Sequence, residues 1–103
     1  MSTEFTKLNN SIITPIMKAK GFRKIGKYHY GATFDKAFYK SPEKECQIIY
    51  SVHPSDYPIL GIRFEEISNG KVVFKKQYLL EGRDLGGLVK TLAGDLEAGN
   101  ITI

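Results

Sequence analysis

The sequence predicts an α+β fold, in which an antiparallel sheet of four to five strands forms a meander. An N-terminal and a C-terminal helix flank the sheet and pack on one of its faces. Apolar residues recur at helical spacing near both ends of the chain, and between residues 22 and 80 they alternate with a period of two, interrupted by turn-forming segments. The chain has 103 residues, 42% hydrophobic and 25% charged, which fits a single domain over residues 1–103.

The first helix is predicted from apolar residues at helical spacing: Phe5, Leu8, Ile12, Ile16 and Ala19. Gly21 follows in the position of a C-terminal cap, and Phe22 is placed to pack back on Met17. Pro15 lies inside this helix, where its missing N–H costs about 3 kcal/mol if nothing relieves it. We therefore expect a bend at Pro15.

The first strands are predicted from alternation over residues 27–34 and 46–53. In the first stretch, alternation assigns three aromatic residues to the buried face and three other residues to the outer face. The buried set is Tyr28, Tyr30 and Phe34, and the outer set is Lys27, His29 and Thr33. In the second stretch, Cys46 shares the apolar parity of Ile48 and Tyr50, which predicts a buried, unreactive thiol.

A hairpin is predicted around residues 68–70. A two-residue Asn-Gly turn would mix the two sheet faces, whereas a three-residue loop with Gly70 in the left-handed conformation of a bulge keeps them separate. The pairs that follow are Phe64 with Phe74, Leu60 with Tyr78, and Ile62 with Lys76. The last of these pairs sets a lysine opposite an apolar residue.

The clearest helix runs from about Asp84 to Ala98, with Asp84 as N-cap and Gly99 as the residue after the C-cap. Its apolar stripe consists of Leu85, Leu88, Val89, Leu92 and Leu96. The opposite side, which we call the helix back, consists of Gly87, Thr91, Gly94 and Ala98. Either a second copy or another protein packs on this helix back, or the helix tolerates glycines that cost roughly 1 kcal/mol each.

The sequence carries no signature of catalysis, of a metal site or of a cofactor site. Cys46 is the only cysteine, and no recognised ligand spacing links it to His29 or His53. The Gly-rich turn at residues 82–87 matches neither common nucleotide-binding pattern. The N-terminus lacks a basic leader with an apolar run, and no stretch approaches the roughly 18 apolar residues that cross a bilayer. We expect a cytoplasmic protein that is not an enzyme and has no membrane partner.

The positive charge is concentrated in one stretch. Residues 18–40 contain one acidic residue, Asp35, and seven of the fifteen Lys and Arg. These seven cations, the basic set, are Lys18, Lys20, Arg23, Lys24, Lys27, Lys36 and Lys40. Phe38 shares strand parity with Lys36 and Lys40, but alternation over residues 27–34 separates Tyr28, Tyr30 and Phe34 from Lys27. Such a set holds phosphates without reading bases, and a solvated basic face is the alternative.

Residues 16–30, a helix ending in Lys-Gly-Phe-Arg-Lys before a Tyr-rich strand, resemble small helix-then-sheet domains of unknown function from bacteria and phages. The last strand with its following helix is similar to transcription-coactivator-like single-strand binders, from which the chain departs in having an N-terminal helix. Neither resemblance assigns an activity or a site residue.

The leading hypothesis is a small binding protein whose basic set engages nucleic-acid phosphates with little sequence specificity. The alternative is a protein–protein interaction module, for example a phage or mobile-element inhibitor that binds an acidic surface of a host complex or forms a homodimer through its last helix. A third hypothesis, an enzyme that uses His53 and Asp56, depends on a turn-forming loop alone.

Overall fold

The computed structural model describes residues 3–29, 34–51, 59–79 and 85–99, with the backbone alone at residues 3, 28, 29 and 34. Several predictions lie outside the described residues. They concern the side chains of Tyr28, Tyr30 and Phe34, the cap at Asp84, and the loop with His53 and Asp56.

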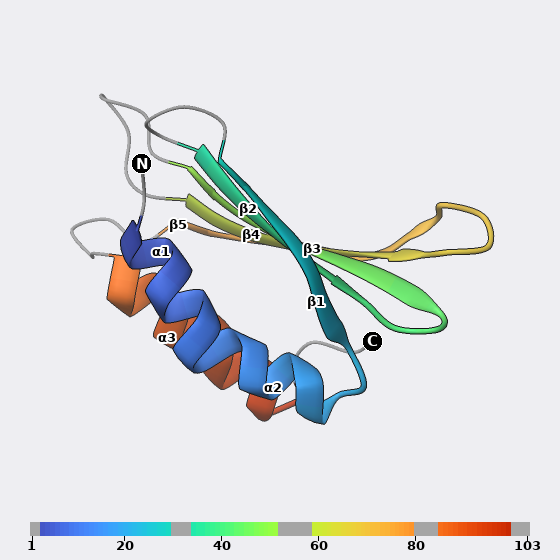
Figure 1. Cartoon of the computed structure of the whole chain (residues 1–103), viewed down its shortest axis with the longest axis horizontal. Coiled ribbons are helices and arrows are strands. Elements are labelled where there is room, and N and C mark those ends of the chain that lie inside the picture. The colour runs from blue at the N-terminus through green and yellow to red at the C-terminus, as the bar shows by residue number, and fades with distance from the viewer. Residues whose placement is uncertain (1–2, 30–33, 52–58, 80–84, 100–103) are drawn as a thin grey trace.

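The predicted α+β meander is confirmed, with five strands. The elements are α1 (Thr3–Leu8), η1 (Asn9–Ile13), α2 (Thr14–Ala19), β1 (Arg23–His29), β2 (Phe34–Lys40), β3 (Lys44–Ser51), β4 (Ile59–Glu66), β5 (Val72–Leu79) and α3 (Leu85–Glu97). Neighbouring strands are antiparallel, and the sheet order follows the chain order from β1 to β5. The helices gather on one face of the sheet, which leaves an open face on the other side (Figure 1).

The N-terminal helix accommodates Pro15 through a π-helical turn. The turn η1 lies between α1 and α2, and the backbone N–H of Thr14 donates to the carbonyl of Asn9, five residues earlier. Pro15 follows within the first turn of α2, directly after this wider turn, and it lacks the N–H that a regular continuous helix would use there. The irregularity expected at Pro15 therefore takes the form of a wider turn just before it.

The end of α2 closes as the sequence predicts. Gly21 has a φ of +90°, its N–H donates to the carbonyl of Lys18 at 3.0 Å, and the N–H of Phe22 donates to the carbonyl of Met17 at 3.0 Å. These two bonds form a Schellman cap, in which Phe22 and Met17 are both buried in the core. The reversal brings Arg23, the first residue of β1, next to the last turn of α2.

The core lies between the helices and the covered face of the sheet. The apolar stripe predicted for α3 is buried, as are Cys46 and Ile48 of β3. Along the N-terminal helix, however, the fully buried positions are Phe5, Asn9, Ile13 and Met17, while Ala19 is exposed. Asn9 thus occupies a core position. The spacing of apolar residues does not predict this position, because Asn9 is polar.

The predicted pairing of β4 with β5 is confirmed: Phe64 pairs with Phe74, Leu60 with Tyr78, and Ile62 with Lys76. The lysine of the last pair reaches α3, where its Nζ lies 3.2 Å from Oδ2 of Asp95 and 4.9 Å from the centre of the Tyr78 ring. The Tyr78 hydroxyl donates to the same carboxylate oxygen at 2.7 Å. Lys76 and Tyr78 of the edge strand β5 therefore both hold α3 through Asp95.

The turn of this hairpin differs from the prediction in one respect. Gly70 has the predicted left-handed backbone, with a φ of +66°, but the N–H of Glu66 donates to the carbonyl of Lys71, so the loop has four residues, 67–70. Glu65 pairs with Val72, so the extra residue that restores the register is Val73 in β5. The bulge thus lies in the strand instead of at the glycine.

Candidate nucleic-acid interface

A bulge in β1 moves part of the basic set to the covered side of the sheet. The pairing of β1 with β2 shifts between Lys24 and Gly26, so Lys24 pairs with Tyr39 and Lys27 with Ala37. Tyr39 and Ala37 are both fully buried under the helices. Lys27, predicted on the outer face, therefore lies on the helix side, because simple alternation fails across the extra residue.

Both lysines contact the N-terminal helix. The Nζ of Lys24 donates to Oδ1 of Asn10 at 2.5 Å, and the Nζ of Lys27 donates to Oγ1 of Thr6 at 2.7 Å. Partial burial lowers the pKa of Lys24, and the nearby positive charge of Lys27 lowers it further. These two cations act in holding the helix along the β1 edge, and they are poorly placed to bind a ligand on the open face.

Three other members of the basic set converge on one depression. Lys18 comes from α2, Arg23 from the start of β1 and Lys40 from the end of β2, and Arg23 and Lys40 are a direct cross-strand pair. The remaining lining residues are Gly21, Phe22, Ser41 and Pro42. We call this hollow of about 460 Å³ the basic depression; none of its lining residues is acidic. Lys20 is exposed in the adjoining turn.

The open face continues from this depression. Lys36, Phe38 and Lys40 alternate with the buried Ala37 and Tyr39, so all three belong to the face that the helices do not cover. Phe38 is half-buried and pairs with Gly26, which has no side chain to cover it from β1. The cations and an aromatic ring therefore share one surface, as a single-strand binding site requires.

Two further cations lie on the open face. Arg63 of β4 and Lys75 of β5 are cross-strand partners, and Arg63 forms an ion pair with Glu65. Sequence reasoning missed both as site residues, although the hairpin register that it predicted already places them opposite each other. The signal was present in that register, although both residues lie outside the basic stretch of residues 18–40.

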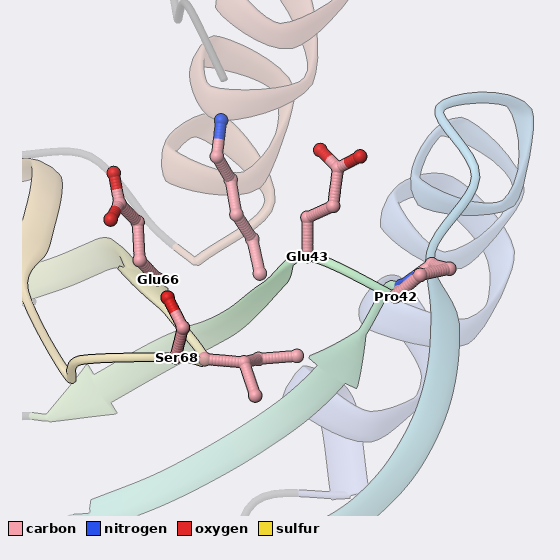
Figure 2. A pocket seen from close by; sticks show the side chains of 6 residues that line it. Pro42, Glu43, Glu66 and Ser68 are labelled. Atoms are coloured by element: carbon pink, nitrogen blue, oxygen red, sulfur yellow. The ribbon is translucent and has the colours of Figure 1, made fainter.

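An acidic pocket borders the basic depression. It is lined by Pro42, which it shares with the depression, and by Glu43, Lys44, Glu66, Ile67 and Ser68. Figure 2 shows the labelled carboxylates of Glu43 and Glu66 rising from neighbouring turns in the same direction. The two turns are joined, since the N–H of Ile67 donates to the carbonyl of Glu43 at 3.0 Å. The two carboxylates disfavour an anion in this pocket, which lies next to the basic depression.

The helix back of α3 is partly accessible. Gly94 and Ala98 are exposed, and a Cβ added at Gly94 would have no atom within 4 Å. Gly87 and Thr91 are half-buried, and the Thr91 hydroxyl donates to the carbonyl of Gly87 at 2.9 Å. The structure thus leaves room for a partner at Gly94, and it identifies none.

Within the described residues, the other chemical candidates form no site. Cys46 is fully buried, and this burial raises the pKa of its thiol far above the usual value, as expected for an unreactive cysteine. Among the described residues, no three His, Cys, Asp or Glu side chains gather where they could hold a metal ion. No helix in that part of the chain has the length and apolar character needed to cross a membrane.

Comparison with known proteins gives no relative from which a function could be transferred: no protein-family model, curated protein or solved structure matches the chain.

Proposed function

We propose that the protein is a non-enzymatic nucleic-acid-binding protein that holds phosphates in the basic depression and over the adjoining open face. The observation that carries this proposal is the convergence of Lys18, Arg23 and Lys40, from three separate elements, around one concave surface without a carboxylate in its lining. Cations fixed on separate rigid elements are pre-positioned for phosphate oxygens, and contacts of this kind position a nucleic acid without reading its sequence.

The open face supports the same ligand. Arg23 and Lys40 begin a surface that continues through Lys36 and Phe38 on β2 to Arg63 and Lys75 on β4 and β5. Glu45 pairs with Lys40 and Glu65 with Arg63, so the excess of positive charge is moderate, and tight binding without salt dependence is not expected.

A charge-matched comparison tests the proposal. Arg23→Glu/Lys40→Glu reverses two cations of the depression, whereas Lys7→Glu/Lys90→Glu reverses two exposed helix lysines and changes the net charge equally. Binding of a labelled single-stranded 12-mer is measured by fluorescence anisotropy across a salt series. For two lost phosphate contacts, the slope of log K against log salt falls by about 1.4 in the depression variant.

The helix variant is expected to keep a slope near that of the wild type. Equal weakening by both double variants would show that only net charge matters and would overturn the assignment of the site. Absence of binding by the wild type at low salt would overturn the proposed function, and binding of an acidic protein surface would then become the explanation for the basic set.

A further inference from the structure

The open face has a second hollow, over Gly61 of β4, next to the edge strand β5. It measures about 210 Å³, and its lining side chains include Ile49 and Ile59 on the apolar side and Arg63, Lys75 and Gln77 on the polar side. Ile49 and Gln77 are the cross-strand neighbours of Gly61 on β3 and β5. The hollow therefore exists because the residue between them has no side chain.

Steric crowding does not explain why residue 61 is a glycine. A Cβ at this position would lie 3.8 Å from Cγ of Gln77 and 3.9 Å from the carbonyl oxygen of Ile49, which are ordinary contact distances. A glycine inside a strand weakens the strand, and it often marks a place where a ligand approaches the backbone closely. The free space above Gly61 is thus a feature that the Cβ of an alanine would begin to fill without a steric conflict.

The lining residues match the chemistry of an unpaired base. The half-buried Ile49 and Ile59 offer apolar contact to the flat faces of a heterocycle. The exposed Gln77 carries an amide that both donates and accepts, as the edge of a base requires. Lys75 is exposed in the lining and can reach a flanking phosphate, whereas Arg63 is already paired with Glu65. A duplex keeps its bases stacked and paired, so it cannot insert one into this hollow without unpairing it.

The position of the hollow also fits the proposed path. Phe38 on β2 and Gly61 on β4 lie two strands and one row apart, which is about 12 Å at the usual strand spacing and rise. Lys36, Ile49, Gly61 and Gln77 form one row across the sheet, next to the row of Phe38, Arg63 and Lys75. A single strand that leaves the basic depression can cross both rows.

We infer that the open face binds single-stranded nucleic acid with an unpaired base inserted over Gly61; this inference rests on the proposed function. The probes are a 12-mer oligothymidylate and an abasic deoxyribose-phosphate 12-mer, which carry the same phosphates. The wild type is expected to bind the oligothymidylate about tenfold more tightly, the scale of one base contact. Gly61→Val fills the hollow and should lower this ratio to the part that stacking on Phe38 supplies, without changing abasic binding.

Three further variants separate the base site from the fold and from phosphate binding. Gly61→Ala fills less of the hollow and should give an intermediate ratio, and Gln77→Ala, at an exposed position, should lower the ratio without altering the thermal melt. Arg23→Glu/Lys40→Glu should weaken both probes by the same factor.

Equal binding of both probes by the wild type would overturn the inference while leaving phosphate binding intact. An undiminished preference in Gly61→Val and Gln77→Ala would also overturn it. Failure of the wild type to bind either probe would instead overturn the proposed function.

Discussion

The buried hydroxyl of Tyr39 is predicted to stabilise the π-helical turn, and its removal tests how the N-terminal helix is fixed to the sheet. Tyr39 is fully buried, and its hydroxyl lies 2.8 Å from Oδ1 of Asn9 and 2.9 Å from Oγ1 of Thr14. Asn9 is also fully buried, and its Nδ2 has no hydrogen-bond partner among the described residues. Tyr39→Phe therefore leaves the whole carboxamide of Asn9 without a partner in the core.

The expected cost follows from that burial. An unsatisfied buried polar group costs about 1–3 kcal/mol, and we expect the upper half of this range because both ends of the carboxamide lose or lack partners. For a domain of about 100 residues, a loss of about 2 kcal/mol corresponds to a fall in Tm of roughly 10 °C. Asn9→Leu removes the carboxamide and leaves Tyr39 with Thr14, so it should change stability by less than about 1 kcal/mol.

A double-mutant cycle measured by urea unfolding gives the sign of the interaction free energy between Tyr39 and Asn9, and this sign tests the prediction. Tyr39→Phe/Asn9→Leu should be more stable than Tyr39→Phe alone by at least about 1 kcal/mol, because the second change removes the group that the first one orphaned. Strictly additive losses, or a cost of Tyr39→Phe below about 0.5 kcal/mol, would refute the role given to this hydroxyl.

Two further predictions concern Cys46 and the helix back. Burial raises the pKa of Cys46, so the thiol ionises only on unfolding; stability is full below pH about 8.5 and falls above it by about 1.4 kcal/mol per pH unit. Urea unfolding at pH 7.5 and 9.5 should show this loss in the wild type but not in Cys46→Ala, and parallel pH profiles would contradict it. Gly94→Arg should raise the Tm of a monomer, since Arg is the better helix former by most of about 1 kcal/mol and Gly94 has open space. If the helix back mediates self-association, light scattering should show a dimer that the same change abolishes; a monomeric wild type would remove support for the homodimer.

The hairpin shows what the sequence can determine about this fold. Its register followed from one physical requirement, that Phe64 and Phe74 share the buried face, and the left-handed Gly70 was the residue best suited to the turn. The four-residue loop was missed because the compensating extra residue, Val73, is an ordinary strand former with no distinctive signal. Patterns that follow from burial were thus predictable, whereas the position of an inserted residue was not.

The same limit explains the errors in the candidate site. A bulge near Ile25 changes the face of every later residue in β1, and nothing in the alternation of residues 27–34 marks it. Asn9 was overlooked because its burial depends on a tyrosine thirty positions away. The concentration of positive charge was visible in the sequence. Which of the cations contact the N-terminal helix and which lie on the open face depends on the pairing of β1 with β2.

That division determines how the binding hypothesis has to be tested. From the sequence, the natural experiment reverses Arg23, Lys24 and Lys27 together. In the structure, Lys24 and Lys27 donate to Asn10 and Thr6 of the N-terminal helix, so their reversal removes two contacts that hold this helix along β1. A loss of binding in that triple variant would not distinguish a damaged site from a displaced helix. Among the described residues, neither Arg23 nor Lys40 has a hydrogen bond to the N-terminal helix; they are cross-strand neighbours at the rim of the basic depression, and Lys40 also lies beside Glu45. Reversing this pair therefore perturbs the ligand surface while the contacts between helix and sheet remain, and only its effect on the salt slope reports on phosphate binding.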